Sequence, residues 1–442
     1  MSDVRVITLG DLGEADLERL LWRRGPSDAG VDECVRQIIE AVRVRGDEAL
    51  VEFTEAYDGV RMAPSAMRVG YDDIAAAGDG VQPVLKDALD AAMRNIERFH
   101  AGQVQAGERW VEVEPGVWCG ERCGPIDSVC LYVPRGRGSF ASVACMLAVP
   151  AKIAGCGRRV VCTPPGPDGS VDAATLYVCG QTGVDEVYGV GGAQAVAAVA
   201  YGTQRIARCD KFVGPGNVYV SAARRLLADV IDPGPPAGPS ESLIIADGSA
   251  DAADAAWNLL IEAEHGENST AFLVTESADL AADCGRVVGE LMGQLDERRR
   301  GFVQTVLSER GGIVVADSMD ACIDLANRMA PEHLAMMVAD PWAVHPRIRN
   351  AGEILFGGYP VISLGNYAMG VNAILPTGGR AASASSVGVM DFMTRTELGF
   401  VTAEGFRSLK GRVSVLSRDE GFCAHHLAVE RWSAGGAVRE GT

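Results

Sequence analysis

Apolar residues near the start of the chain recur at three- and four-residue spacing, which is the repeat of one buried helix face. The repeat runs from Val31 to Tyr57 and is interrupted at Gly46, so it predicts a helical hairpin. A second helical repeat covers Val81 to Ala101. Apolar and charged residues then alternate from Trp110 to Glu114, which predicts a half-buried β-strand.

Short β-rich runs alternate with helical stretches in the middle of the chain. The predicted strands are Ser128–Val133, Arg159–Thr163, Glu186–Val190 and Lys211–Val213. The predicted helices are Ser142–Gly155, Ala173–Gly183, Ala193–Gly202 and Val218–Ile231. Glycine and proline mark the junctions, as in a parallel sheet built from βαβ units.

A stretch rich in proline and glycine, 233–239, separates this region from a second alternation of strands and helices. The predicted strands are Ser242–Ala246, Ala271–Val274 and Gly312–Val315, and the predicted helices are Ala252–His265, Leu280–Leu295 and Met319–Met329. Beyond Arg380 we find further short helical patterns. The pattern predicts an α/β fold: two Rossmann-like parallel-sheet domains with small N- and C-terminal helical extensions.

Composition narrows the class of protein. The 442 residues are 48% hydrophobic and 22% charged, as in a globular enzyme, and the net charge of −19 disfavours nucleic acid and anionic membranes as partners. The acidic start of the sequence lacks the basic and apolar stretches of a secretory leader, and no apolar run reaches the roughly 18 residues that a membrane helix needs. We therefore expect a cytoplasmic protein. The twelve cysteines contain no CxxC pair and are interpreted mainly as core residues.

Two glycine-containing loops could hold a nucleotide. In 186–194 a strand leads through glycines into an apolar helix, so free backbone N–H groups face a site where phosphate is favoured. The spacing is not GxGxxG, and a tight strand-to-helix turn explains it equally well. The segment 213–218 repeats the arrangement, and two such loops on one sheet strengthen the nucleotide hypothesis.

Three histidine segments could carry chemistry. Glu262 and His265 are three residues apart on one predicted helix and could reach one metal ion, although a surface pair at a helix end has the same spacing. Glu332 and His333 follow Pro331 in a pattern that we interpret as a helix start, and they suit either acid/base work or a solvated surface. His425 and His426 precede a predicted helix and could simply cap it.

An ordered series of motifs along the chain resembles the histidinol dehydrogenase family. The motifs are Leu131-Tyr132-Val133-Pro134, 150–156, 190–195, 214–217, 237–241, 263–266, Ala330-Pro331-Glu332-His333-Leu334 and Leu375-Pro376-Thr377. The resemblance covers roughly residues 25 to 430. It implies a homodimeric, zinc- and NAD-dependent enzyme that oxidises an alcohol through the aldehyde to a carboxylate.

The resemblance also implies roles for individual residues. Glu332 would activate water and His333 would act as general base. The other implied positions are Tyr132, Gln194 and Asn217 for NAD, Glu262, His265, Asn366 and His425 for zinc, and Ser240, Arg137 and Glu420 for substrate. Its active sites would be shared between the two subunits, because the C-terminal segment that carries His425 would reach into the partner.

The implied division of the chain has four parts. These are a 1–25 extension, a discontinuous metal- and substrate-binding α/β domain of 26–128 and 238–380, an NAD-binding α/β domain of 129–237, and a C-terminal helical segment, 381–442, for dimerisation.

Several positions depart from the family pattern. Glu262 and Asn366 stand where the family has glutamine and aspartate, so the ligand carboxylate has changed place while oxygen donors that suit zinc are kept. Ala373 and Ile362 replace a histidine and an acidic residue, which should weaken selectivity for histidinol. Arg135 and Arg137 stand where glycines are usual, and a guanidinium favours an anionic substrate group.

Three functions follow from these residues. The first is oxidation of an altered small alcohol, either an amino alcohol or an anionic diol such as a dihydroxypropane sulfonate. The second is the histidine-biosynthetic oxidation of L-histidinol. The third is an NAD-binding protein without catalysis, which the presence of Glu332 and His333 disfavours.

Overall fold

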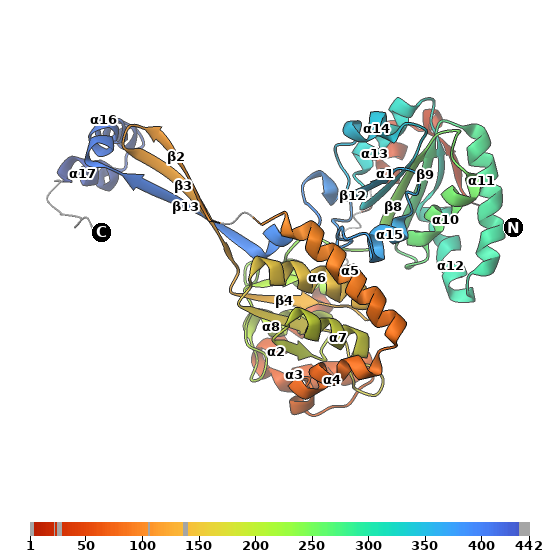
Figure 1. Ribbon diagram of the computed structural model, residues 1–442, viewed down its shortest axis with the longest axis horizontal. Helices are drawn as coiled ribbons and strands as arrows, with labels where there is room; N and C mark the ends of the chain where they lie inside the picture. Colours follow the sequence, from red (N-terminus) through yellow and green to blue (C-terminus); the bar gives the residue numbers. More distant parts are fainter. Residues whose placement is uncertain (1–3, 22, 24–28, 105–106, 136–139, 433–442) are drawn as a thin grey trace. The chain divides into compact units, whose positions relative to one another are not determined.

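The computed structural model describes residues 4–21, 23, 29–104, 107–135 and 140–432 (Figure 1). Contacts divide these residues into two units. The first comprises the described residues up to Val104 together with Ile126–Phe392, and the second comprises the described residues of 105–125 and 393–442. The first unit contains two all-parallel sheets, which confirms the predicted α/β class with two Rossmann-like domains.

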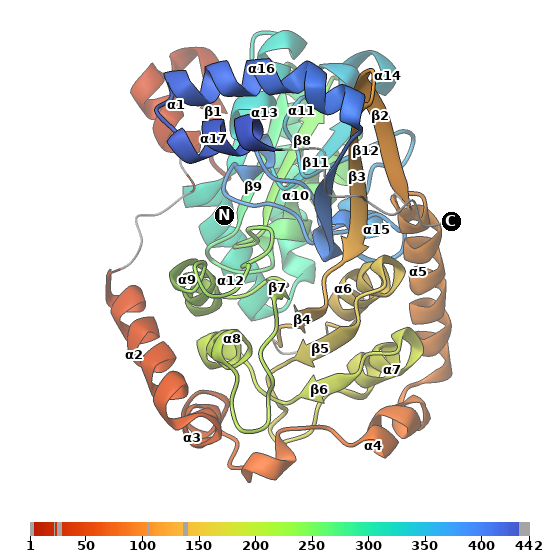
Figure 2. The same cartoon turned by 90° about the vertical axis from the view of Figure 1, so that its left-hand side faces the viewer.

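The smaller parallel sheet has the strand order β6-β5-β4-β7. Its strands are β4 (Ser128–Tyr132), β5 (Arg158–Cys162), β6 (Glu186–Tyr188) and β7 (Lys211–Val213). The helices around it are α2 (Ala29–Arg45), α3 (Asp47–Asp58), α4 (Tyr71–Ala76), α5 (Pro83–Ala101), α6 (Ala141–Ala154), α7 (Ala173–Thr182), α8 (Gly192–Tyr201) and α9 (Val218–Leu226). Helices α2, α3, α8 and α9 cover one face, and α6 and α7 cover the other (Figure 2).

The N-terminal helices belong to a different sheet from the one expected. The sequence analysis grouped residues 26–128 with the metal- and substrate-binding domain, whereas α2 and α3 pack on α8 and α9 of the smaller sheet. Val35 and Leu50 are fully buried there. An amphipathic repeat predicts that a helix has a buried face, but it does not say which sheet buries that face.

The larger parallel sheet has the strand order β1-β10-β9-β8-β11-β12. Its strands are β1 (Val6–Thr8), β8 (Glu241–Ala246), β9 (Thr270–Thr275), β10 (Gly312–Val315), β11 (His333–Met337) and β12 (Glu353–Phe356). Its helices are α1 (Glu14–Leu21), α10 (Ala252–Ala263), α11 (Ala278–Leu291), α12 (Glu297–Thr305), α13 (Met319–Met329), α14 (Pro341–Val344) and α15 (Ile362–Tyr367). Ile244 packs toward α10 and α11 while its neighbour Leu243 packs toward α13. Both faces are therefore covered, and β8 is apolar from Leu243 to Ala246.

Two elements of this sheet differ from the sequence interpretation. The segment 330–334 was interpreted as a helix start, which is wrong, because His333 begins strand β11 between β8 and β12. Leucine, alanine and methionine in 334–337 favour a helix locally, but pairing on both sides and burial in the sheet override that preference. The N-terminal extension also contributes a strand, since Val6–Thr8 pairs with Ile313–Val315.

The second unit combines an antiparallel sheet with two helices. It contains β2 (Glu108–Glu114), β3 (Val117–Pro125), β13 (Met393–Val401), α16 (Ala403–Asp419) and α17 (Cys423–Arg431), with the strand order β13-β3-β2. The expected C-terminal helical segment, 381–442, therefore differs from the observed unit, which begins at Met393 and includes a strand. Pairing of β13 with β3, about 270 residues earlier in the chain, leaves no local signal in the sequence.

No helix in the described part of the chain is long and apolar enough to cross a membrane.

Candidate functional site

A cluster of ionisable side chains lies at the amino ends of three adjacent strands of the larger sheet. Glu241 begins β8, Glu332 directly precedes β11, His333 begins β11, and Glu353 begins β12. His333 lies beside Ser242 on one side and Glu353 on the other. Sites of parallel α/β sheets usually lie at the carboxyl ends of the strands, so this cluster is on the opposite edge.

Carboxylates surround the buried imidazole of His333. Its Nδ1 lies 2.5 Å from Glu353 Oε1, and its Nε2 lies 3.8 Å from Glu332 Oε1 and 3.9 Å from Glu262 Oε1. The side chain of His333 is 4% exposed. The contact with Glu353 fixes the ring, so that Nε2 is the nitrogen left to react.

Burial and charge compete in setting the protonation of this cluster. Burial lowers the pKa of His333, but the negative field of Glu262 and Glu332 and the bond to Glu353 outweigh burial and raise the pKa to about 10. Burial also raises the pKa of Glu332 well above its usual range, although His333 opposes that shift. His333 therefore retains its proton near neutral pH unless a further positive charge is added.

A chain of hydrogen bonds ties Glu332 to the N-terminal segment. Glu332 Oε2 accepts from the backbone N–H of Glu241 at 2.7 Å. The carboxylate of Glu241 accepts from Arg23 Nε at 2.9 Å and from the N–H of Gly378 at 2.8 Å. Arg23 also donates to the carbonyl of Met329, which is the last residue of α13. Arg23 and Glu241 form a buried ion pair that holds the strand ends together.

Three of the four predicted zinc ligands lie together in the first unit. The Nδ2 group of Asn366 on α15 donates to Glu262 Oε1 at 2.9 Å. Glu262 is near the end of α10, and its Oε2 lies 3.3 Å from Nδ1 of His265. The fourth predicted ligand, His425, is an exposed residue of α17 in the second unit.

The chemistry of this set fits a zinc ion. Asn366 Oδ1 is buried and has no hydrogen-bond partner among the described residues, so an oxygen donor is left over beside the Glu262 carboxylate. The carbonyl of Ile261 lies 3.0 Å from His265 Nδ1 and accepts its proton, which leaves Nε2 as a ligand nitrogen. No group of three or more His, Cys, Asp or Glu in the described chain is placed to hold a metal. The set of Glu262, His265 and Asn366 contains only two such residues, because its third member is an asparagine.

Two of the predicted NAD residues meet at the start of α8. The hydroxyl of Tyr132, at the end of β4, accepts from the N–H of Gly192 at 3.0 Å. Gln194 is 1% exposed, and its Oε1 has no partner among the described residues. Asn217 lies at the next loop and caps α9, because its Oδ1 accepts from the N–H groups of Tyr219 and Val220.

The structure does not bring the three predicted substrate residues together as it does three of the predicted zinc ligands. Ser240 is half-buried directly before β8, where its carbonyl accepts from the N–H of Thr270. Glu420 is exposed at the end of α16 in the second unit. Arg137 lies outside the described residues.

Sequence reasoning missed Glu353 and Arg23 as members of the site. Glu353 follows no recognisable motif, and only its pairing with His333 across two strands brings it into contact with the imidazole. A Cβ on Gly365 would lie 2.7 Å from Glu353 Oε2, so this glycine lets α15 approach the carboxylate. Arg23 is 218 residues from Glu241 in the chain, and no local pattern links the two.

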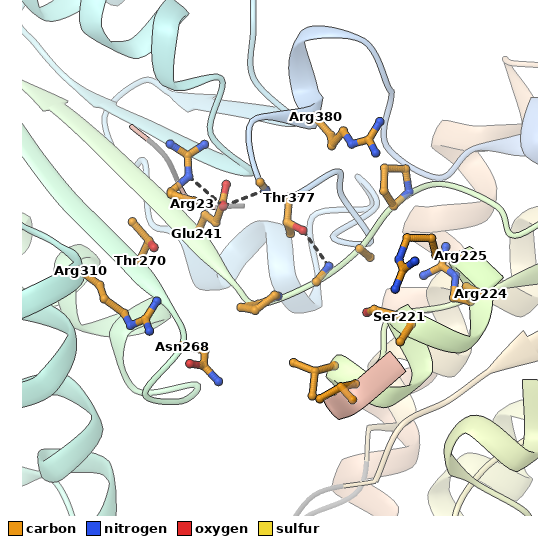
Figure 3. Close-up of a pocket in the computed structure, with 18 of the residues that line it drawn as sticks. Arg23, Ser221, Arg224, Arg225, Glu241, Asn268, Thr270, Arg310, Thr377 and Arg380 are labelled. Carbon is orange, nitrogen blue, oxygen red and sulfur yellow. Dashed lines mark hydrogen bonds and ion pairs between the residues drawn. The ribbon is translucent and has the colours of Figure 1, made fainter. Parts of the chain in front are cut away.

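A cleft of about 1430 Å³ borders the site (Figure 3). Glu241, Thr270 and Thr377 line it together with seven arginines, Arg5, Arg19, Arg23, Arg224, Arg225, Arg310 and Arg380. Arg23 pairs with Glu241, and Arg225 pairs with Asp32. Arg310 and Arg380 form no ion pair with a described residue, so the cleft contains positive charge that an anionic ligand could meet.

Comparison with known proteins gives consistent similarities. The sequence model of the family described as histidinol dehydrogenase matches residues 22–432. A histidinol dehydrogenase of Synechocystis sp. is 44% identical over 428 residues, covering 96% of this chain and 98% of that protein. A histidinol dehydrogenase homolog of Colwellia psychrerythraea is 42% identical and covers 96% of each chain. The crystal structure of histidinol dehydrogenase from Elizabethkingia anophelis superposes with a TM-score of 0.90 at 31% identity and covers 96% of each chain.

The ion pair between Arg23 and Glu241 supplies a stability prediction. Replacing Arg23 with alanine leaves a buried carboxylate without its cation, so the free energy of unfolding should fall by about 3–5 kcal/mol. Arg19→Ala is the matched control, because Arg19 is exposed in its contact with Asp16 and its loss should have no measurable effect. Urea denaturation followed by circular dichroism measures both. Equal stability of the two variants would contradict the importance of the buried pair.

Proposed function

Because this chain belongs to the histidinol dehydrogenase family of oxidoreductases, we propose that it oxidises a small alcohol through the aldehyde to the carboxylate, with NAD as oxidant. NAD-dependent oxidation of an alcohol to an acid is the general reaction of the family. The observation that carries the proposal for this chain is the buried pair of Glu332 and His333, whose reactive atoms lie 3.8 Å apart. An acid/base pair at this spacing can serve two consecutive proton transfers.

The two oxidations use the two residues in turn. NAD, when bound, would supply the oxidant for both steps by accepting hydride. In the first oxidation His333 Nε2 would accept the hydroxyl proton of the alcohol. In the second, Glu332 would accept a proton from the water that adds to the aldehyde carbon, and His333, having released its first proton to solvent, would accept the hydroxyl proton of the hydrate. Glu353 positions the ring of His333 and touches neither substrate nor cofactor.

We also propose that Glu262, His265, Asn366 and His425 hold a zinc ion. Zinc, when bound, polarises the alcohol oxygen and so makes its proton easier to remove. Positive charge beside Glu262 also opposes the carboxylate field that raises the pKa of His333, and this favours the neutral imidazole that a base requires. The unpartnered Asn366 Oδ1 and the oriented His265 support this assignment.

Zinc binding is testable apart from turnover. Chelator-treated protein should rebind one zinc per subunit, as measured by elemental analysis, and its melting temperature should rise with zinc concentration. Glu262→Ala should weaken zinc binding by at least the roughly 10- to 100-fold typical of losing an outer-shell partner. The control is Glu267→Ala, an exposed residue of the loop that follows α10. Equal zinc affinity in both variants would remove Glu262 from the site.

We propose that NAD binds at the carboxyl ends of β4 and β7. The strand order of this sheet changes direction there, and such a point is where dinucleotides bind in parallel sheets. The buried, unpartnered Gln194 Oε1 and the Tyr132 hydroxyl beside the start of α8 support this position. The N-termini of α8 and α9 offer backbone N–H groups to phosphate.

The second unit supports a homodimer with shared active sites. It exposes large apolar side chains that a protein normally buries, namely Trp110, Val111, Phe400, Val415, Leu416, Phe422 and Trp432. His426 is engaged by Ser414 and Arg418 of α16, whereas the ring of neighbouring His425 contacts only that of Phe422 among the described aromatic residues. A second copy of the chain would cover the apolar surface and receive His425.

Subunit mixing tests the shared site. Homodimers of His333→Asn and of His425→Ala should each oxidise alcohol far more slowly than the wild type. If each site takes His333 from one subunit and His425 from the other, mixed dimers contain one site with both defects and one with none. Co-refolded mixtures should then recover activity, up to about a quarter of wild type for random pairing of equal amounts. Absence of recovery in a mixture that forms dimers by light scattering would contradict sharing.

The proposed substrate is an alcohol other than L-histidinol, with a small anionic group as the favoured class. Ala373 offers no side-chain hydrogen bond, and Ile362 is fully buried in the apolar core beside α10. Arg310 and Arg380 in the cleft support an anionic ligand. L-histidinol is the second candidate, because relatives at more than 40% identity carry the name histidinol dehydrogenase.

A substrate panel decides between these candidates. NADH release should be measured with zinc for L-histidinol, other amino alcohols, sulfonated diols and neutral polyols. Two lost hydrogen bonds at about 1–3 kcal/mol each should make kcat/KM for L-histidinol at least tenfold lower than for the best anionic alcohol. A highest kcat/KM for L-histidinol would establish the biosynthetic alternative.

Two variants test the roles of His333 and Glu332 with the best substrate of that panel. His333→Asn should slow the oxidation of alcohol, and Glu332→Gln should mainly slow the oxidation of the corresponding aldehyde. Wild-type rates for both variants on both compounds would contradict the assignment of the pair.

A further inference from the structure

Asp58 is a half-buried acidic residue that the proposed mechanism does not use. It is the last residue of α3, where the partial negative charge of the helix end disfavours a carboxylate. Its Oδ2 is buried and has no hydrogen-bond partner among the described residues. Burial raises the pKa of Asp58, and the nearby Arg135 opposes that shift. A carboxylate oxygen that is buried without a hydrogen-bond partner suggests a ligand as the missing partner.

The surroundings of Asp58 place it at the carboxyl edge of the smaller sheet. A Cβ on Gly169, in the loop after β5, would lie 3.5 Å from Val60, two residues beyond Asp58. The guanidinium of Arg135, three residues beyond the end of β4, lies against Gly166 of the same loop. The negative charge of Asp58 also acts on the Tyr132 hydroxyl at the end of β4. Asp58 thus lies beside the ends of β4 and β5.

This edge has a defined use in dinucleotide-binding sheets. The order β6-β5-β4-β7 corresponds to strands 3-2-1-4 of the Rossmann arrangement, so β4 and β5 are its first and second strands. An acidic side chain near the end of the second strand accepts hydrogen bonds from the adenosine ribose of NAD, whereas an arginine there accommodates the 2′-phosphate of NADP.

The loop after β5 contains two acids, Asp168 and Asp172, and each is engaged locally. Asp172 caps α7, where its Oδ2 accepts from the N–H of Thr175 at 2.8 Å. Asp168 Oδ1 accepts from the N–H of Ser170 at 3.1 Å and from the Ser170 hydroxyl at 2.7 Å. It is an exposed residue that closes its own turn. Asp58 reaches the same edge from a helix outside the βαβ repeat and has an acceptor oxygen left over.

We propose that Asp58 binds the hydroxyl groups of the adenosine ribose of NAD and excludes the 2′-phosphate of NADP. The inference rests on the proposed use of NAD and adds its coenzyme selectivity. Arg135 is the nearby cation that could favour a phosphate. It acts on both Asp58 and Asp168, so two carboxylates face one guanidinium and the local charge favours the unphosphorylated ribose.

The test uses ligands that contain only the adenosine half of the coenzyme. Calorimetric titration of the full chain with ADP-ribose and with 2′-phospho-ADP-ribose should show a preference for ADP-ribose. Asp58→Asn should weaken ADP-ribose binding by about tenfold or more, since a hydrogen bond to a charged acceptor is lost. It should also reduce the ratio of the affinity for ADP-ribose to that for 2′-phospho-ADP-ribose. The melting temperature should stay or rise, because a charge at the unfavourable end of α3 is removed. Asp58→Ser, a second substitution, should bind as Asp58→Asn does.

Asp168→Asn is the matched control. Asp168 is an acid at the same edge of the sheet, but its carboxylate is bonded to Ser170 within its own turn. It should leave ADP-ribose affinity within about twofold of wild type. Equal losses in both variants would indicate a diffuse charge effect and overturn the inference, as would unchanged binding in Asp58→Asn or a wild-type preference for the 2′-phospho ligand.

The inference and the proposed function fail in different ways. A protein that binds ADP-ribose through Asp58 but oxidises no alcohol would overturn the function alone. A protein that oxidises an alcohol with NAD while Asp58→Asn binds normally would overturn the inference alone. No binding of either ligand to the wild type would overturn both.

Discussion

The attraction between one buried imidazole and the carboxylates around it is the constraint on which the site depends. Glu262, Glu332 and Glu353 face His333 in a region from which water is largely excluded, and each charge is costly there unless an opposite charge is close. Among the described residues, Arg23 compensates Glu241 and His333 compensates the rest only in part. The excess of negative charge explains both the raised pKa of His333 and the affinity for a cation that we propose.

The two parallel sheets present opposite edges for the two parts of the proposed chemistry. The larger sheet uses the amino ends of β8, β11 and β12, where adjacent strands bring Glu241, His333 and Glu353 together. The smaller sheet uses the carboxyl ends of β4, β5 and β7, where glycine loops and helix N-termini suit a nucleotide. Acid/base groups and nucleotide loops therefore come from separate, rigid frameworks within the first unit.

Burial of charge also links the site to distant segments of the chain. Arg23 joins the N-terminal segment to Glu241 and to the end of α13, and Glu241 in turn supports the Glu332 carboxylate through its backbone N–H. A defect in this support would act on Glu332 although Arg23 touches none of the reacting groups. The second unit differs, since it exposes aromatic and aliphatic side chains that a protein normally buries.

The sequence by itself determined the elements whose signals are local. Alternating strand and helix patterns predicted β4 to β10, α6 to α11 and α13, because periodicity and the glycines that end each segment are local features of the sequence. The motifs also identified Glu262, Asn366, Glu332 and His333, and the structure brings these four together. Only the tertiary structure decided that His333 begins a strand, that α2 and α3 cover the smaller sheet, and that β13 pairs with β3. It also decided that Glu353 contacts His333, that Arg23 pairs with Glu241, and that Asp58 lies near Arg135. Each of these depends on contacts between residues far apart in the chain, and burial against a distant partner overrides the local preference that a sequence pattern records.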